Sequence, residues 1–539
     1  MWVLGINWEW QDSAAALVDH DGRVWAYVEE ERLTRIKHAW NTFPIRASAS
    51  CLAAAGISWE DLDVVAVGWD LPHYRRWYYP ARDRERLLRE LFRATVGDRS
   101  KPEVLFIEHH LAHASSAFYA SGFEQAGVLV ADGSGEFYST SIYSMSRSAE
   151  PRSLRHWPRG FSLGALYEAA TRTIGFGELE SGKTMGLASY ERSRPINIFP
   201  IGDFAAESRP FFDLPDSTRY KTFVDAWISY ISRTHAGVTR PPHELHKDLA
   251  AVSVAARAQR TIEHSLSALH AETVRLSGRS QVCLAGGVAL NCVANGLLPE
   301  PVYIPPFPHD GGVALGAAWA VCPPNRAHQL VSPYLGNDLA PASMAELRDE
   351  GLKVSPYSPE AVVRLLAQRK IGAVAEGRAE AGPRALGHRS IVALPSDADQ
   401  RTIINAKKGR EPWRPLAPVT LPSYAPMLWP SQGDRERYMV GNASVSGHGR
   451  SVMPAAVHVD GTTRPQVLHQ DGASVLEGIL LGLEAVGIPP VLVNTSLNKR
   501  GHPIADSVED VLDTFRAAEL DFAVIGDTLI ERSDTDCKG

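Results

Sequence analysis

Three segments of the sequence share a strand-and-turn design that strongly limits the fold. Residues 2–32 comprise an apolar strand, a polar turn with Asp12, a second apolar strand, an Asp-Gly turn and a third strand. Residues 126–145 repeat the pattern around an Asp-Gly-Ser-Gly turn that begins at Asp132. Residues 280–298 form an apolar strand that leads into a Gly-Gly turn and a helix. Such turns between apolar runs predict hairpins and strand-to-helix connections, and hence an α/β fold.

Two Asp-bearing hairpins followed by a Gly-Gly turn are the arrangement by which actin-like ATPases hold a nucleotide. Backbone amides of the two hairpins face the phosphates, and the glycines let the chain approach the adenosine closely. Each loop by itself is also compatible with an ordinary hairpin. Taken together, the three segments predict an actin-like nucleotide-binding domain.

The length of the chain requires more than this one domain. It has 539 residues, and a single core rarely grows beyond about 300 residues. Composition shifts toward Pro, Asn and Ser over residues 321–343. We therefore predict a first domain over 1–340 and a second α/β domain over 350–539, which begins with a helix near 359–369 and the strand 371–377.

Charge and composition exclude several classes of protein. A net charge of −7 and a pI near 6.3 disfavour a broad nucleic-acid-binding surface. The N-terminus lacks the pattern of a signal peptide, and the longest apolar run is broken by Glu477, Glu484 and a Pro pair, so we expect no membrane span. The five cysteines are odd in number and lack CxxC spacing, which is typical of cytoplasmic thiols. The oligomeric state is not readable from the sequence.

The segment HHLAHA places His109 and His113 four residues apart, on one face of a helix. There they can pack or cap the helix, or bind one metal ion. Asp132 and Asp310 each stand at a turn and add two carboxylates. Two imidazoles and two carboxylates suit Fe(II), Mn(II) or Zn(II), and a metal beside phosphate-binding loops predicts a clamp on a nucleotide.

A second motif is misleading. Residues 177–184, GELESGKT, match the P-loop pattern GxxxxGK[ST]. A true P-loop follows a buried strand, whereas residues 163–177 have the spacing of a helix, and two glutamates would face the phosphates. The P-loop interpretation is therefore disfavoured, and a plain P-loop ATPase stays as an alternative. Lys183, flanked by glycine in an exposed loop, remains suited to an anion.

The motifs HHLAHA, VADGSGE, SGKTMGLA and AGGVALN, with EEERLTRIKH near the start, resemble the O-carbamoyltransferase family over nearly the whole chain. The resemblance implies an actin-like N-terminal domain, like that of the tRNA threonylcarbamoyl-transfer proteins, and a YrdC-like C-terminal domain. It makes His109, His113, Asp132 and Asp310 the ligands of an iron-type ion on the nucleotide. Around the nucleotide, or the carbamoyl-adenylate, it places Lys37, Gly133, Lys183, Gly286, Gly287 and Asn291.

The C-terminal domain carries a group of cationic and polar residues among glycines and prolines, which is unlike a solvated tail. They are Arg384, Arg389, Lys408, Arg410, Arg414, His458, Arg464, Asn494 and Ser496. Guanidinium forks suit phosphate and carboxylate oxygens, and two anionic substrates must be held against their mutual repulsion. The resemblance implies that this domain makes carbamoyl-adenylate from carbamoyl phosphate and ATP with Mg²⁺, with Arg384 and Lys408 as catalytic residues.

The expected reaction is then the attack of a hydroxyl of a small-molecule acceptor on the carbamoyl carbon. The family typically has His-Asp in the first loop, but this sequence has Gln11-Asp12. Glutamine is no base, so that role falls to Asp12 or to another residue. An alternative is a metal- and nucleotide-binding protein that acts on tRNA in threonylcarbamoyl transfer, which the negative net charge disfavours.

Overall fold

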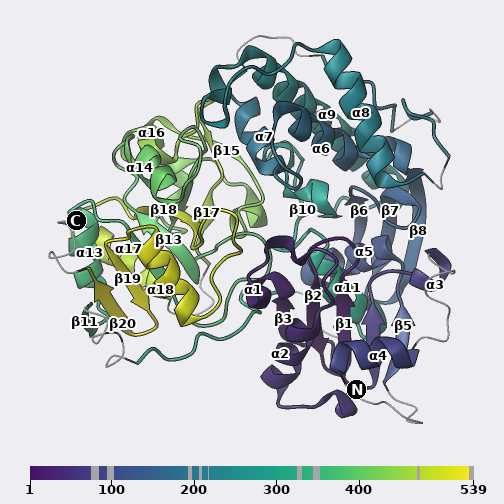
Figure 1. The fold of residues 1–539 in the computed structure, drawn as a ribbon, viewed down its shortest axis with the longest axis horizontal. Coiled ribbons are helices and arrows are strands. Elements are labelled where there is room, and N and C mark those ends of the chain that lie inside the picture. Colours follow the sequence, from purple (N-terminus) through teal and green to yellow (C-terminus); the bar gives the residue numbers. More distant parts are fainter. Residues whose placement is uncertain are drawn as a thin grey trace. The chain divides into compact units, whose positions relative to one another are not determined.

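The computed structural model describes residues 1–74, 84–93, 102–191, 197–204, 209–215, 218–324, 330–343, 347, 352–469 and 474–532. The chain divides into two compact units. One comprises Met1–Thr34 and His38–Val331, and the other comprises Arg35–Lys37 and Ser332–Gly539. Both are mixed α/β units (Figure 1), which confirms the predicted class.

Two five-stranded sheets in the first unit repeat one topology. The first contains β1 (Val3–Asn7), β2 (Ala14–Val18), β3 (Val24–Glu29), β4 (Val64–Val67) and β5 (Glu103–Phe106), in the order β3-β2-β1-β4-β5. The second contains β6 (Gln125–Ala131), β7 (Tyr138–Ser146), β8 (Ala149–Pro158), β9 (Val282–Ala285) and β10 (Val302–Tyr303), in the order β10-β9-β6-β7-β8. In each sheet the first three strands are antiparallel neighbours and the last two run parallel to the first strand.

The predicted hairpins are therefore present, with Asp12 between β1 and β2 and Asp132 directly after β6. The third strand of the second sheet, β8, was not anticipated. The Gly-Gly segment also forms as expected, since β9 leads into a 3₁₀ turn at Gly287–Leu290. This duplication agrees with an actin-like architecture, which stays a prediction.

Helices of the first unit surround these sheets. They are α1 (Glu30–Thr34), α2 (Ile45–Ala55), α3 (Leu71–Tyr74), α4 (Arg84–Phe92), α5 (His109–Ala120), α6 (Leu163–Ile174), α7 (Ser181–Ala188), α8 (Tyr220–Thr234), α9 (Leu249–Ser277), α10 (Cys292–Asn295) and α11 (Gly311–Val321). Helix α11 packs on β1 and β2, α5 packs on β6 and β9, and the two helices pack on each other. The two central helices thus lie between the two sheets (Figure 1).

The second unit is built on one eight-stranded sheet of mixed direction, in the order β11-β20-β19-β12-β13-β18-β14-β17. Its strands are β11 (Lys353–Pro356), β12 (Gly372–Ala375), β13 (Arg389–Ala393), β14 (Ala417–Thr420), β17 (Gln466–Val467), β18 (Val491–Ser496), β19 (Phe522–Ile525) and β20 (Thr528–Glu531). A small sheet pairs β15 (Ala443–Ser444) with β16 (Thr462–Thr463). The predicted strand at 371–377 is β12, and β11 precedes the predicted first helix.

Helices cover both faces of this sheet. They are α13 (Pro359–Ala367), α14 (Gln400–Lys407), α15 (Ala425–Leu428), α16 (Gly447–Val452), α17 (Val475–Ala485) and α18 (Val508–Ala517). Strand residues alternate between two apolar cores, because successive side chains point to opposite faces. Val374 packs with the residues of α13 and α17, whereas its neighbour Ala373 packs with those of α18.

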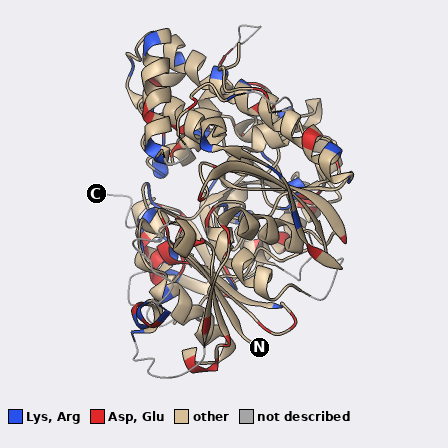
Figure 2. Cartoon of the chain, turned by 90° about the vertical axis from the view of Figure 1, so that its right-hand side faces the viewer, with Lys and Arg blue, Asp and Glu red and all other residues tan. Residues whose placement is uncertain are grey.

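Among the described residues, no helix is both long enough and apolar enough to cross a membrane. Lys, Arg, Asp and Glu are interspersed along the ribbon (Figure 2), and neither sign of charge is confined to one segment.

Candidate metal centre and anion-binding cluster

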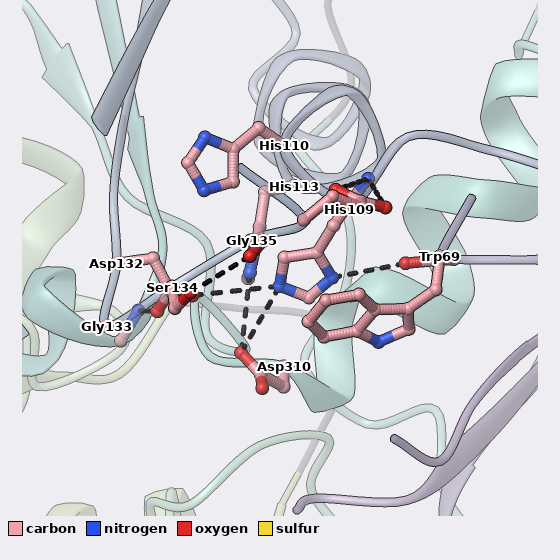
Figure 3. A network of polar contacts seen from close by, with 12 residues as sticks. Trp69, His109, His110, His113, Asp132, Gly133, Ser134, Gly135 and Asp310 are labelled. Atoms are coloured by element: carbon pink, nitrogen blue, oxygen red, sulfur yellow. Dashed lines mark hydrogen bonds and ion pairs between the residues drawn. The ribbon is translucent and has the colours of Figure 1, made fainter. Parts of the chain in front are cut away.

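The four predicted metal ligands come together in the first unit (Figure 3). The imidazoles of His109 and His113 project from α5, Asp132 follows β6, and Asp310 immediately precedes α11. One ligand atom from each of the four side chains lies within 4.8 Å of the other three, and all four residues are buried. The four-residue spacing of the two histidines on one helix therefore directs both imidazoles toward the same point.

Distances within this cluster suit a bound cation better than direct hydrogen bonds. His109 Nε2 lies 3.7 Å from Asp132 Oδ2 and 3.8 Å from Asp310 Oδ1, and His113 Nε2 lies 3.5 Å from Asp310 Oδ1. Both Nε2 atoms are buried and have no hydrogen-bond partner among the described residues. Such orphaned buried nitrogens are costly unless they are satisfied by a ligand, so the site fits a first-row transition metal.

The pKa values within the cluster also favour a bound cation. Burial raises the pKa of Asp310 to about 8, and the neighbouring carboxylate of Asp132 adds to the effect. Burial lowers the pKa of His113 to about 3. Against the effect of burial, the two aspartates raise the pKa of His109 to about 9. Without a metal, protons must therefore neutralise part of this cluster, and a divalent cation would displace them.

His109 is oriented by its surroundings. Its Nδ1 lies 3.1 Å from the carbonyl oxygen of Gly68, which favours the tautomer with the proton on Nδ1 and leaves the Nε2 lone pair for a metal. The ring of Trp69 stacks on its imidazole at 3.9 Å between centroids (Figure 3). Trp69 Nε1 donates to Asn7 Oδ1 at 2.9 Å. Neither Trp69 nor Asn7 was a sequence candidate, because no local motif marks a residue that contacts the site across the fold.

Two carboxylates hold the start of α5. Glu108 accepts from the backbone amides of His110 and Leu111, and Glu136 accepts from the amide of His109 at 3.0 Å. These contacts satisfy amides that have no partner within the helix. Burial raises the pKa of Glu136 to about 7. These contacts thereby fix the first turn of α5, the helix that carries both histidine ligands.

His110 does not join the cluster. It points away from the four ligands (Figure 3), and its Nδ1 lies 2.6 Å from Ser141 Oγ on β7. The three histidines of HHLAHA are therefore divided between one metal site and one sheet contact.

Close backbone packing brings Asp310 opposite the histidines. A Cβ atom at Gly316 of α11 would lie 1.8 Å from the carbonyl oxygen of Ala112 on α5, and one at Gly5 would lie 1.9 Å from that of Ala314. Only glycine permits these approaches. The sequence GGVALGAAWA therefore sets the distance between the two helices that carry three of the four ligands.

We expect Gly316→Ala to destabilise the protein by about 1–3 kcal/mol, because the added methyl group overpacks a backbone contact. Its metal content should fall as α11 is displaced. The matched control is Gly182→Ala on α7, where a Cβ atom meets nothing within 4 Å. That change should be neutral or stabilising by up to about 1 kcal/mol. Thermal unfolding and metal analysis measure both effects, and equal melting temperatures would contradict the packing argument.

Of the residues predicted to surround a nucleotide, some lie beside the metal ligand Asp132 and others contact different parts of the unit. Asp132 Oδ1 accepts from the amide of Gly287 at 2.8 Å, which joins the Gly-Gly turn to the metal ligand. Gly286 has φ +92°, and a Cβ there would lie 2.3 Å from Ala131 O. The side chain of Asn291 caps α10 and exchanges two amide hydrogen bonds with Gln259. In this structure the Asn291 side chain is hydrogen-bonded within the protein, and its contact with a nucleotide stays a prediction.

The structure corrects the expectation that Lys183 lies in an exposed loop. Lys183 is on helix α7 and only 7% exposed, and it pairs with Glu180 at 2.5 Å. The segment before it is helix α6 rather than a strand, so residues 177–184 lack the strand that precedes a P-loop. Gly133 lies in the turn after β6, next to Tyr220. Lys37 belongs to the second unit rather than to the first.

The second unit gathers most of the predicted cations near the end of β18. Arg410 donates to Thr495 Oγ1 at 3.1 Å and to Ser496 Oγ at 3.2 Å. Lys408 is buried and donates to the carbonyl of Ser496 and to Asn498 Oδ1. Six cations of this unit make up what we call the cation cluster: Lys37, Arg384, Lys408, Arg410, Arg414 and Arg464.

The cations of this cluster lower one another's pKa values. Burial lowers the pKa of Arg410, and the charges of Arg414, Arg464 and Arg384 lower it further. Burial likewise lowers the pKa of Lys408, with contributions from Arg410, Arg414 and Lys37. Cations held together against repulsion in a partly buried place are suited to polyanionic ligands.

Other predicted residues have structural partners. Arg389 is fully buried, and its guanidinium donates to the carbonyl oxygens of Glu376, Gly377, His388 and Asp506, so it holds its own loops rather than facing a ligand. Asn494 Nδ2 donates to Gln466 Oε1 at 2.6 Å. Burial lowers the pKa of His458 to about 4, and its ring lies 3.8 Å from Asp460.

Comparisons with known proteins cover nearly the whole chain. A family model of the carbamoyltransferase N-terminus matches residues 2–95 and 77–319, and one of the carbamoyltransferase C-terminus matches residues 363–532. Nodulation protein NolNO of Sinorhizobium fredii is 34% identical over 97% of this chain and 79% of its own length. Nodulation protein NolO of Bradyrhizobium diazoefficiens is 32% identical over 79% of each chain, and nodulation protein U of Rhizobium tropici is 28% identical over 91% of this chain and 90% of its own length.

Solved structures give weaker similarities. An activator of 2-hydroxyisocaproyl-CoA dehydratase from Clostridium difficile covers 59% of this chain and 94% of its own, with a TM-score of 0.35 and 14% identity. HypF of T. kodakarensis covers 59% of this chain and 47% of its own, with a TM-score of 0.35 and 13% identity. Scores this low support no inference about function.

Proposed function

Because this chain belongs to the carbamoyltransferase family, we propose that it is an ATP-dependent O-carbamoyltransferase that acts on a small-molecule hydroxyl. Carbamoyl phosphate supplies the carbamoyl group, and carbamoyl-adenylate is the intermediate. One observation carries this proposal: the chain brings four buried potential metal ligands together in one unit and a cation cluster in the other. Each suits one half of such a reaction.

The cation cluster serves the first half-reaction. Two polyanions, ATP and carbamoyl phosphate, repel each other, so fixed guanidinium groups are needed to hold them together with Mg²⁺. Arg384, Arg410 and Arg464 provide these groups, and the buried Lys408 fixes the end of β18 beside them. Water first cleaves carbamoyl phosphate into carbamate and phosphate. A carbamate oxygen then attacks the α-phosphorus of ATP, the bond from that phosphorus to the β-phosphate oxygen breaks, and pyrophosphate leaves. The YrdC-like assignment of this unit is part of the same proposal.

The first unit serves the second half-reaction. A metal bound by His109, His113, Asp132 and Asp310 would supply positive charge for the phosphate of the carbamoyl-adenylate and for the departing AMP. The amide of Gly287 orients Asp132, and the Gly68 carbonyl orients His109. We place the adenylate between the loops that follow β6 and β9, in keeping with an actin-like architecture.

The acceptor is sought by direct assay. The protein is incubated with ATP, carbamoyl phosphate and a panel of hydroxylated natural products, and each compound is checked for the mass gain of one carbamoyl group. The motifs resemble those of tobramycin carbamoyltransferase, so aminoglycosides belong in the panel beside sugars, cephems and macrolides. Pyrophosphate release that requires both substrates, but no RNA, supports the proposal. Release that requires added tRNA would favour threonylcarbamoyl transfer instead.

A further inference from the structure

Two loops of the first unit meet at a histidine and an aspartate. One loop joins β1 to β2 and carries Asp12, and the other follows α1 and carries His38. The amide of Asp12 donates to the carbonyl of His38 at 2.7 Å, and the amide of Asn41 donates to the carbonyl of Trp10 at 3.0 Å. These two backbone hydrogen bonds connect the loops on both sides of the pair.

The backbone of both loops is strained. Trp10, Asp12, His38, Ala39 and Asn41 all have positive φ, at 66°, 53°, 64°, 37° and 46°. Residues other than glycine avoid this region, and such strain persists only where neighbouring contacts enforce it, most often at functional sites. Here the enforcing contacts include the loop-to-loop hydrogen bonds and Glu31 Oε2, which accepts from the amide of His38 at 2.6 Å. The strain therefore serves to place the His38 side chain.

The side chains form an oriented pair. His38 Nδ1 lies 2.8 Å from Asp12 Oδ1. A carboxylate only accepts hydrogen bonds, so the pair fixes the tautomer with the proton on Nδ1 and leaves a lone pair on Nε2. Within the described part of the chain, no residue hydrogen-bonds to that Nε2. The His38 side chain is 25% exposed and that of Asp12 is 10% exposed, so a substrate can reach the imidazole.

This pair is linked to the metal centre. The negative charge of Asp12 contributes to the raised pKa of Asp310, which lies in the four-ligand cluster. Asn7 Nδ2 donates to the carbonyl of Asp12 at 3.2 Å, while Asn7 Oδ1 accepts from Trp69, whose ring stacks on His109. A continuous set of contacts thus connects the first loop with a metal ligand.

The family that the sequence resembles typically has a histidine in the first loop where this chain has Gln11, so this loop contains no imidazole of its own. A neutral amide takes up no proton at neutral pH, and Asp12 is already engaged with His38. An imidazole oriented by a carboxylate is the arrangement that activates hydroxyl groups in many enzymes.

We propose that His38 is the catalytic base of the transfer step and that Asp12 is its positioning residue, an inference that rests on the proposed function. The acceptor O–H bond breaks and its proton moves to His38 Nε2. The acceptor oxygen bonds to the carbamoyl carbon, and the bond from that carbon to the phosphate oxygen breaks with its electron pair leaving on AMP. The imidazolium then returns the proton to solvent.

The direct test is His38→Gln, assayed with the panel compound that the wild-type protein carbamoylates. Transfer should fall by roughly 10²–10⁴-fold, the usual contribution of a general base, while pyrophosphate release is retained. The control is His20→Gln in the turn between β2 and β3, where the side chain is 70% exposed, and transfer should be unchanged. Normal transfer by His38→Gln overturns the assignment.

Transfer to a second nucleophile, hydroxylamine, distinguishes a catalytic base from a residue that acts only through the structure. Hydroxylamine attacks acyl groups with little help from a base and would give hydroxyurea from carbamoyl-adenylate. His38→Gln should form hydroxyurea at the wild-type rate, above a control without enzyme. If hydroxyurea formation falls as far as transfer to the alcohol, His38 acts through structure and the proposal is wrong.

A third readout needs no acceptor. Diethyl pyrocarbonate acylates histidine nitrogens that carry a lone pair, and mass spectrometry locates the modified residue. His38 should react in the wild-type protein and several-fold more slowly in Asp12→Asn, with His20 as the internal reference. An unreactive His38, or one indifferent to Asp12→Asn, contradicts the oriented pair. By contrast, absence of pyrophosphate release from the wild-type protein would contradict the proposed function itself.

Discussion

Arg384→Ala should strongly reduce carbamoyl phosphate-dependent pyrophosphate release while the protein stays folded and keeps its metal. Arg384 is one of the cations whose charge lowers the pKa of Arg410, so it lies within the cation cluster of the second unit. Removing one member of a desolvated, charge-assisted contact typically costs about 2–5 kcal/mol. The corresponding loss of rate is roughly 30-fold to several-thousand-fold.

The measurement is pyrophosphate release with ATP and carbamoyl phosphate, run beside metal analysis and circular dichroism. Arg369→Ala is the matched control, since that arginine belongs to the same unit and its side chain is 72% exposed and paired with Asp397. Exposed ion pairs of this kind contribute little, and the control should behave as wild type. Normal pyrophosphate release by Arg384→Ala would remove the cation cluster from the first half-reaction.

The opposite defect is expected from His113→Ala. The purified wild-type protein should carry roughly one first-row transition metal per chain, because two imidazoles and two carboxylates converge on one point and suit such an ion. His113→Ala removes one imidazole and leaves the two aspartates to repel each other, so metal should be lost and acceptor carbamoylation should fail. Carbamoyl phosphate-dependent pyrophosphate release should persist at least in part, because the cation cluster lies in the other unit.

His110→Gln tests whether the effect is specific to the ligands. His110 is on the same helix but contacts Ser141, so this variant should retain its metal. Metal content by elemental analysis and both half-reactions are measured in parallel. Full metal occupancy in a His109→Ala, His113→Ala double variant would refute the metal centre. Normal carbamoylation by His113→Ala would refute the division of the two half-reactions.

Local patterns in the sequence were sufficient for part of the fold. Apolar runs separated by Asp-Gly and Gly-Gly turns predicted β1, β2, β6, β7 and β9, because strand formation and tight turns depend on residues that are neighbours in sequence. The HxxxH spacing indicated a shared helix face, and the four ligands it suggested do converge. The same local reasoning disfavoured the P-loop, and a helix does precede residues 177–184.

Local patterns do not identify which partners the fold brings to a side chain from distant parts of the sequence. Arg389 has the residue type and the glycine-rich neighbourhood of an anion ligand, yet carbonyl oxygens from several loops surround its guanidinium. Asn291 is similarly engaged by Gln259 of α9, and Lys183 is buried on a helix. A hydrogen-bonding group binds whichever partner the fold brings nearest, and the sequence around it does not identify that partner.

The sequence by itself thus predicted the hairpins of the first unit, the Gly-Gly turn, the metal-binding residue types and the family. Only the tertiary structure decided which side chains meet. Glycines at positions 5 and 316 let α11 approach β1 and α5 closely enough to bring Asp310 to the histidines. Hydrogen bonds between two strained loops bring His38 to Asp12 across 26 residues of sequence. Such contacts form because packing and backbone hydrogen bonding over the whole unit offset the local cost of strain, and no short stretch of sequence contains that balance.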